Sequence, residues 1–274
     1  MRIVIVTDSH LAPSAPACNA NWCAVRDYAA RTAADLTVHL GDITLDGATD
    51  PGQLDSARAM CLPWPTPFRF LPGNHDIGDN PPSPEVAPKR PVEPSLLERF
   101  RSNFGPDYWT VFVEGWSMIG LNAQLFGSGI PSETAQWQWL EHCAARAGKH
   151  PVVLLLHKPL FQNTREDSIA HIRYVPLEPR GRLLRLLAPL DLRLVLSGHT
   201  HQYLDRKIEG VRHIWIPSTG FFVPDADQER VGEKITGLGV LELSCEYFRF
   251  DLVCPDGLAR NNFADQPFRK LLHA

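Results

Sequence analysis

Several features are scarce or absent in this sequence, and each excludes a class of protein. The formal net charge is −4, with 27 lysine and arginine residues against 31 aspartate and glutamate residues, so there is no basic field to hold an extended nucleic acid. The six cysteines include no CxxC pair and have no regular spacing, which argues against a zinc ribbon or a redox pair and favours free thiols. No apolar run approaches the ~18 residues that a membrane span requires.

The amino terminus lacks the basic segment and the apolar core of about 7 to 15 residues that mark a secretory signal. We therefore expect a cytoplasmic protein without membrane attachment. A chain of 274 residues, 44% of them hydrophobic, is long enough to bury one large core. Residues 1–274 are therefore expected to form a single domain.

Five apolar runs are each followed by residues that can bind metal ions. The run at 68–71 leads into Pro72-Gly73-Asn74-His75-Asp76. The other four lead in the same way into Asp8-Ser9-His10, Gly41-Asp42, His157 and Ser197-Gly198-His199-Thr200-His201. Because residues that follow the carboxyl ends of neighbouring strands converge on one crevice, we expect these side chains to form one site.

The first part of the chain alternates between strand-like and helical segments. Strands are expected at 3–7, 36–40 and 68–71, with helices at 21–34 and 53–60 between them. This alternation predicts right-handed crossovers and a largely parallel sheet.

The rest of the chain has a different pattern. Residues 77–94 contain six prolines, which excludes a regular element and predicts a long loop. Two strand-like runs, at 109–113 and 117–122, predict a hairpin in a second, more antiparallel sheet. The other expected elements are helices at 95–103, from Pro131 with Ser132 as N-cap, and at 182–188, strands at 152–156 and 192–196, antiparallel strands at 213–217, 239–243 and 248–253, and a C-terminal tail at 255–274.

Taken in order, the five ligand-bearing blocks resemble the calcineurin-like metallophosphoesterase superfamily, and within it the bacterial enzymes similar to class III cyclic-nucleotide phosphodiesterases. The blocks span residues 8–201, and as a set they are highly specific. The resemblance implies an α/β fold, a four-layer αββα sandwich of two mixed β-sheets flanked by helices, with a dinuclear metal site at the strand ends. It leaves the substrate open, because the superfamily includes phosphomonoesterases, phosphodiesterases, nucleases and a few metal-poor scaffolds.

The resemblance also implies which residues hold the metal ions. One ion would be bound by Asp8, His10, Asp42 and His201, and the other by Asp42, Asn74, His157 and His199, so that Asp42 bridges the pair. Two divalent ions about 3.5 to 4 Å apart can clamp a phosphate and lower the pKa of a bridging water. Nitrogen and oxygen ligands without a thiolate suit Mn, Fe or Zn, and we expect Mn or Fe, with Zn as the alternative.

His75 directly follows the expected ligand Asn74. The resemblance implies that His75 faces the phosphate and protonates the leaving alkoxide as a general acid, a role typically worth about 10² to 10⁴-fold in rate. Asp76 is expected either to orient His75 or to cap the turn. Relatives often place an acid three residues after the bridging aspartate to orient this histidine, but here that position is Leu45 and the acid, Asp46, comes one residue later.

Two segments leave directly from ligand-bearing turns, at 77–94 and 161–174. We expect both to shape the mouth of the site, because loops in such positions commonly set specificity. The candidates for contacting the non-reacting part of the substrate are Arg165, His171, Arg173 and Tyr174.

The leading interpretation is a metal-dependent phosphodiesterase that acts on a small substrate such as a cyclic nucleotide or a glycerophosphodiester. A phosphomonoesterase with the same dinuclear site is the alternative. A nuclease is expected to add a basic groove or a capping domain, and neither is apparent. A non-catalytic scaffold predicts missing ligands or a lost His75, whereas all seven ligands and His75 are present. The sequence leaves the oligomeric state open.

Overall fold

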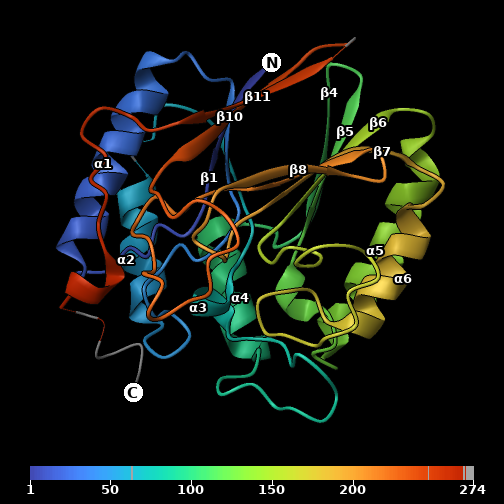
Figure 1. Cartoon of the computed structure of the whole chain (residues 1–274), viewed down its shortest axis with the longest axis horizontal. Helices are drawn as coiled ribbons and strands as arrows, with labels where there is room; N and C mark the ends of the chain where they lie inside the picture. The colour runs from blue at the N-terminus through green and yellow to red at the C-terminus, as the bar shows by residue number, and fades with distance from the viewer. Residues whose placement is uncertain (63, 246, 268, 270–274) are drawn as a thin grey trace.

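The computed structural model describes residues 1–62, 64–245, 247–267 and 269. Two β-sheets lie face to face between layers of helices, with α1 and α2 on one side and α5 and α6 on the other (Figure 1). The predicted αββα sandwich of two mixed sheets is therefore confirmed. The helices are α1 (Pro16–Arg31), α2 (Gly52–Cys61), α3 (Asn74–Ile77), α4 (Pro94–Phe104), α5 (Pro131–Ala147) and α6 (Leu177–Leu187), with 3₁₀ turns η1 (Ala123–Leu125) and η2 (Phe263–Asp265).

The first sheet has the strand order β11-β10-β1-β2-β3. Its strands are β1 (Arg2–Val6), β2 (Leu36–His39), β3 (Phe68–Phe70), β10 (Leu238–Leu243) and β11 (Phe248–Val253). β1, β2 and β3 are parallel, as the strand and helix alternation predicted. The late strand β10 pairs antiparallel with β1, and β11 pairs antiparallel with β10 at the edge. The carboxyl ends of β1, β2 and β3 therefore lie along one edge of the sheet.

The second sheet has the strand order β4-β5-β6-β7-β9-β8. Its strands are β4 (Trp109–Val113), β5 (Trp116–Leu121), β6 (Pro151–Leu156), β7 (Asp191–Ser197), β8 (Leu204–Ile208) and β9 (Val211–Trp215). The β4–β5 hairpin is confirmed, but the expectation of a more antiparallel sheet is wrong. β5, β6, β7 and β9 are parallel, because crossovers through α5 and α6 return the chain to the same edge.

The antiparallel strand expected at 213–217 is β9, which begins earlier, at Val211, and is antiparallel to β8 but parallel to β7. The charged edge strand β8, which was not predicted, runs back from the end of β7. β9 then inserts between β7 and β8 and is parallel to β7.

The buried strands read as unbroken apolar runs because both of their faces are covered. In β1, Ile3 and Ile5 pack in the core between the two sheets, whereas Val4 and Val6 pack under the helices. This division follows from the two-residue period of a strand.

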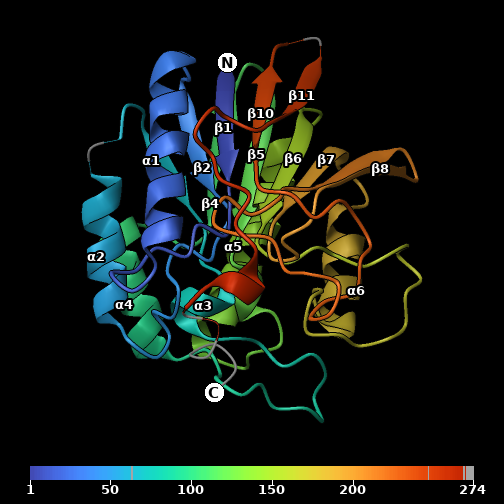
Figure 2. The ribbon, with the colours of Figure 1, turned by 60° about the vertical axis from the view of Figure 1, so that its left-hand side comes forward.

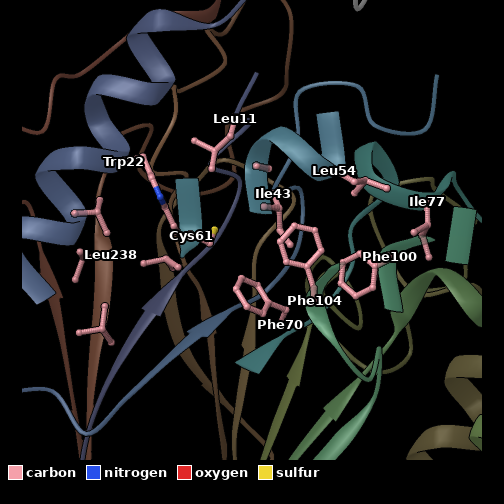
Figure 3. Close-up of a cluster of buried hydrophobic side chains, with 14 of the residues drawn as sticks. Leu11, Trp22, Ile43, Leu54, Cys61, Phe70, Ile77, Phe100, Phe104 and Leu238 are labelled. Atoms are coloured by element: carbon pink, nitrogen blue, oxygen red, sulfur yellow. The ribbon is translucent and has the colours of Figure 1, made fainter. Parts of the chain in front are cut away.

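The core under α1, α2 and α4 also holds the ligand-bearing turns in place. Figure 3 shows Trp22, Phe70 and Phe100 in this cluster together with Leu11 and Ile43. Leu11 directly follows His10, and Ile43 directly follows Asp42. Each side chain is fully buried, a burial worth roughly 1.5 to 3 kcal/mol, so each turn is anchored one residue away from a candidate ligand.

Helix starts were the least accurate predictions. α1 begins at Pro16 and α6 at Leu177, both earlier than expected. The N-cap of α5 is Ile130, and the prediction of Ser132 was wrong because Pro131 occupies the first helical turn. Proline suits the first helical position, where its fixed φ is helical and its missing N–H is not needed.

Residues between α3 and α4 form the predicted loop, which extends away from the sheets at the bottom of both views (Figures 1 and 2). Isolated bridges join Asp79 to Pro91 and Ser83 to Val86 within it. The predicted C-terminal tail packs back against the sandwich in its described part, and residues 268 and 270–274 lie outside the described residues. Among the helices that the structure describes, none has the length and apolarity needed to cross a membrane.

Candidate metal centre

All seven expected ligands lie just past the carboxyl ends of parallel strands. Asp8 and His10 follow β1, Asp42 follows β2, Asn74 begins α3 after β3, His157 follows β6, and His199 and His201 follow β7. The structure brings them together from both sheets, in two clusters that we describe in turn, and a third group of His10, Asp42 and His75 links the two.

The first cluster, which we call the Asp8 subsite, consists of Asp8, His10 and His201. His201 Nε2 lies 3.3 Å from Asp8 Oδ1 and 3.1 Å from His10 Nε2. All three side chains are buried. Asp8 Oδ1 has no hydrogen-bond partner among the described residues, although its other oxygen accepts from the hydroxyl of Thr7 and the amide of His199.

The second cluster, the Asp42 subsite, consists of Asp42, Asn74, His157 and His199. His157 Nε2 lies 3.2 Å from Asp42 Oδ2, 3.3 Å from Asn74 Oδ1 and 3.1 Å from His199 Nδ1. Asp42 also has a carboxylate oxygen within 4.8 Å of a ring nitrogen of His10. Asp42 is thus the carboxylate that lies between the two subsites.

These separations test whether metal ions fit. Ligand atoms that share one ion at a bond length of about 2.1 Å lie about 3.0 to 3.4 Å apart. The separations that involve His201 or His157, 3.1 to 3.3 Å, fall in that range. His10 Nε2 and Asp8 Oδ1 are 4.0 Å apart, which is closer to the separation of about 4.2 Å between ligands on opposite sides of one ion. Asp8 Oδ1 is buried and meets the ring of His201 at 3.3 Å without hydrogen-bond geometry, and such an oxygen is stabilised when a cation faces it. The residues therefore fit a pair of divalent ions.

The backbone of the ligand turns is unusual. Five of the seven candidate ligands have left-handed φ angles between 49° and 66°. They are Asp8, His10, Asp42, His199 and His201. In the described part of the chain, the other non-glycine residues with positive φ lie in exposed turns. A left-handed residue of this kind costs about 1 to 3 kcal/mol and persists where the surroundings enforce it, which is common at functional sites.

Two glycines allow the turns to approach one another. A Cβ atom on Gly73 would lie 2.1 Å from Asp42 Oδ1, and one on Gly198 would lie 2.0 Å from Thr7 Oγ1. Each glycine therefore precedes a candidate ligand at a position where any side chain would push two ligand turns apart.

Backbone carbonyls orient two of the imidazole ligands. His157 Nδ1 lies 3.1 Å from the oxygen of Leu40, and His201 Nδ1 lies 2.8 Å from the oxygen of Phe221. A proton on Nδ1 that is donated to a carbonyl leaves the Nε2 lone pair for a metal ion. Both Nε2 atoms do point at the other ligands of their subsite.

The protonation states of Asp42, His10 and His199 suit the binding of a cation. Burial would raise the pKa of Asp42, but the charges of His157 and His75 hold it well below its usual range. Burial lowers the pKa of both His10 and His199, and neighbouring histidines lower it further. Burial also opposes protonation of His157, but Asp42 outweighs it and raises that pKa to about 9. A cation in the Asp42 subsite must therefore displace a proton from His157.

His75 lies between the subsites and is partly exposed. Its Nδ1 lies 2.7 Å from the carbonyl oxygen of Leu45, and its ring meets the ring of His10 edge-on at 4.9 Å. The carbonyl of Leu45 thus orients His75, in place of the acid that relatives often carry there. Asp46 instead pairs with Arg90 of the proline-rich loop.

Asp76 caps the turn and does not orient His75. Its carboxylate accepts hydrogen bonds from the backbone amides of Ile43, Thr44 and Gly73 and from the hydroxyl of Thr44, at 2.8 to 3.2 Å. Burial and the nearby charge of Asp42 raise the pKa of Asp76 to about 6. Asp76 therefore fastens the Asn74 turn to the Asp42 turn.

The four expected substrate contacts are dispersed. Arg165 pairs with Glu209, which lies at the far end of β8 from His201, so the structure does not bring Arg165 to the ligands. Tyr174 is buried, with its ring 6.1 Å from that of Trp215. His171 and Arg173 lie beside Tyr174. Within the described residues, no hydrogen bond, ion pair or ring contact joins these four residues to a candidate ligand, and their role stays a prediction.

A buried polar network behind Asn74 was not predicted. The amine of Lys158, which follows His157, donates to Asp79 at 2.5 Å and to Asn80 at 2.6 Å. With its amide oriented to satisfy its neighbours, Gln124 donates to both Asp79 and Asn80 and accepts from the backbone amide of Asn74 at 2.9 Å. The one signal in the sequence is a lysine directly after an apolar strand and a ligand.

The comparison with known families agrees with this geometry. A sequence model described as calcineurin-like phosphoesterase matches residues 1–203. The chain belongs to the calcineurin-like phosphoesterase family. Members of this family use a dinuclear divalent metal site, and the two subsites supply candidate ligands for it.

Two curated proteins illustrate the range of the family. The chain is 30% identical over 142 residues to serine/threonine-protein phosphatase CPPED1 of Danio rerio, and the aligned region covers 50% of this chain and 42% of that protein. It is 29% identical over 222 residues to the 3',5'-cyclic adenosine monophosphate phosphodiesterase CpdA of Escherichia coli (strain K12), which covers 77% of this chain and 71% of that protein. The chain thus spans less than half of the length of CPPED1.

A solved structure shares the fold. A dimetal phosphatase from Danio rerio aligns with a TM-score of 0.64 at 13% sequence identity, over 92% of this chain and 95% of that chain. At this identity the similarity concerns the fold alone, and it agrees with the sandwich of two mixed sheets.

Proposed function

We propose that this protein is a metal-dependent phosphodiesterase that acts on a small phosphodiester of the cyclic-nucleotide or glycerophosphodiester type. The observation that carries the proposal is the cluster of oxygen and nitrogen ligands, 3.1 to 4.0 Å apart within each subsite, with His75 beside it. The similarity to CpdA supports a diester substrate, because it extends over 77% of the chain whereas the similarity to CPPED1 extends over 50%.

In this proposal the two subsites hold two divalent ions, of Mn or Fe with Zn as the alternative. Bound ions supply Lewis-acid stabilisation of the phosphate and activate the attacking water. Asp8, His10 and His201 hold one ion, and Asn74, His157 and His199 hold the other. The carboxylate of Asp42 lies between the subsites and offsets the repulsion of two cations.

His75 acts as the general acid. Its Nδ1 is held by the carbonyl of Leu45 at 2.7 Å, which leaves Nε2 as the atom that meets the substrate. A protonated Nε2 donates to the departing alkoxide, whose conjugate alcohol has a pKa far above neutrality, and so prevents the build-up of charge on the leaving oxygen. Because His75 is partly exposed, the proton can be replaced from solvent.

A phosphomonoesterase is the second candidate, favoured by the similarity to a protein named as a phosphatase. The same ligands would serve both reactions, so turnover must separate them. We expect Mn-loaded protein to hydrolyse bis-p-nitrophenyl phosphate and 3',5'-cyclic AMP with a higher kcat/KM than p-nitrophenyl phosphate. A clear preference for the monoester would overturn the phosphodiesterase assignment.

The proposed substrates are small phosphoesters and not nucleic acid polymers, since the net charge of −4 provides no basic field. The cytoplasm remains the predicted compartment, and cell fractionation tests it.

A further inference from the structure

His10 differs from His157 and His201 in how its ring is oriented. His157 and His201 each have Nδ1 beside a backbone carbonyl, whereas Nδ1 of His10 is buried without a hydrogen-bond partner among the described residues. The ring of His10 is held by other rings. It stacks on Phe221 at 4.8 Å with an interplanar angle of 29°, and it meets His75 edge-on.

Phe221 contacts a second ligand of the same subsite. Its ring lies 4.7 Å from the ring of His201, and its carbonyl oxygen lies 2.8 Å from His201 Nδ1. Phe221 is itself buried. One residue thus fixes two of the three ligands in the Asp8 subsite.

The strap that carries Phe221, residues 218–222, is fastened to the third ligand. The hydroxyl of Ser218 donates to the carbonyl of Asp8 at 2.7 Å, and the amide of Gly220 donates to the same oxygen at 3.1 Å. The amide and the hydroxyl of Thr219 donate to the carbonyl of Thr7, each at 3.1 Å. The strap and the end of β1 therefore form one hydrogen-bonded unit.

The C-terminal segment braces this strap from behind. Phe263 stacks on Phe221 at 5.1 Å, and its amide donates to the carbonyl of Phe222 at 2.9 Å. The amide of Phe222 donates to Asn261, whose side chain donates to the carbonyl of Gly220 at 3.0 Å. The strap and its brace both lie beyond residues 1–203, where the family match ends.

We infer that Phe221, braced by Phe263, is the positioning residue of the Asp8 subsite, so that the C-terminal segment is a working part of the metal centre. The inference rests on the proposed dinuclear site. An imidazole without an Nδ1 hydrogen bond can rotate unless packing prevents it, and partners that orient metal ligands are typically worth 10 to 100-fold in metal affinity. The stacked ring of Phe221 takes that role for His10.

The test counts bound Mn²⁺ by equilibrium dialysis and isothermal titration calorimetry. We expect the wild type to bind two ions per chain. Phe221→Leu and Phe263→Leu should bind one ion with wild-type affinity and the second ion about 10-fold or more weakly. His10→Ala is the reference for loss of the Asp8 subsite. With one Mn²⁺ added per chain, electron paramagnetic resonance of the Leu variants should show isolated Mn²⁺, because only the Asp42 subsite is filled.

Phe250→Leu is the matched control, because Phe250 is 6% exposed like Phe263 but packs between the sheets. It should keep both ions at wild-type affinity, and Phe263→Tyr, which retains the ring, should restore the second ion. If Phe221→Leu does not fold, the comparison of Phe263→Leu with Phe263→Tyr tests the inference alone. Wild-type affinity in both Leu variants, or an equal loss in Phe250→Leu, would overturn the inference. A wild type that binds two ions yet cleaves no phosphoester would refute the proposed function and leave this inference standing.

Discussion

The two subsites lie side by side but are supported by different interactions. The Asp8 subsite is buried and is backed by aromatic rings and a strap from the C-terminal region. The Asp42 subsite is partly open at Asn74 and His199 and is backed by buried charges and amides. Packing thus supports the candidate ligands of one subsite and polar networks support those of the other, so we expect that each subsite can be weakened without the other.

The largest effect is expected at Asp42, the carboxylate that lies between the two subsites. Asp42→Asn removes the negative charge that both ions share, so we expect loss of both ions and a fall in kcat/KM of at least about 10³-fold, since Lewis-acid stabilisation is worth several kcal/mol. Elemental analysis of the purified variant measures the ions. Asp27→Asn, on the exposed face of α1, is the control. Two ions per chain with unchanged turnover would exclude Asp42 as the bridge.

His75 contacts both subsites, through the ring of His10 and through its amide, which donates to Asp42 Oδ1 at 2.8 Å. If it is the general acid and not a ligand, His75→Ala should keep both ions. Its rate on diesters with alkyl leaving groups should fall about 10² to 10⁴-fold. With p-nitrophenolate, which departs without a proton, a much larger fraction of the rate should remain.

The comparison across leaving groups also separates the other roles of His75. A loss that is uniform across leaving-group pKa would mean that His75 positions the phosphate. Loss of an ion from the variant would make it a ligand.

The polar support of the Asp42 subsite is tested by Lys158→Met. Removing one partner of a buried ion pair leaves Asp79 without its cation, and we expect the free energy of unfolding to fall by about 3 kcal/mol. The affinity for one Mn²⁺ should fall about 10-fold, because Gln124 and Asn74 lose their support. Lys149→Met, on an exposed lysine, is the control. Equal weakening of both ions would show that the subsites are not supported separately.

The smallest effect is expected in the proline-rich loop, whose role at the mouth of the site stays a prediction. The pair between Arg90 and Asp46 joins the proline-rich loop to the residue after Leu45, but Arg90 is largely exposed, and such pairs are worth at most about 1 kcal/mol. Arg90→Ala should therefore lower kcat/KM by less than about fivefold and leave both ions bound, with Lys89→Ala as the neighbouring control. A larger loss, measured by steady-state kinetics, would give the loop a direct contact with substrate.

The part of the site that the sequence could predict is the convergence of the candidate ligands. Asp8, Asp42 and His157 each come within three residues of the end of an apolar strand, and parallel strands place those ends at one edge. Residue type and position along the chain were therefore enough to place these candidate ligands at one edge, while their role as ligands stays a prediction. The layered fold, which the resemblance implied, is confirmed. The parallel insertion of β9 was not predicted, because the alternating, charged residues of β8 gave no strong signal of a strand.

The supports behind the ligands could not be predicted in this way. The contact between the carbonyl of Leu45 and His75 cannot be predicted from residue type, since every residue has a carbonyl. Phe221 and Phe263 are separated from His10 by more than 200 residues in sequence and look like ordinary core aromatics. Their roles depend on which distant segments the fold brings together, and that is a property of tertiary packing.

The central claim is that one chain holds two ions in two differently supported subsites that share Asp42. A crystal of the Mn-loaded protein, measured with anomalous scattering at the manganese edge, tests it most directly. The account predicts two peaks per chain, one in contact with Asp8, His10 and His201 and one in contact with Asn74, His157 and His199, with Asp42 touching both. A single peak, or an ion bound by His75, would contradict it.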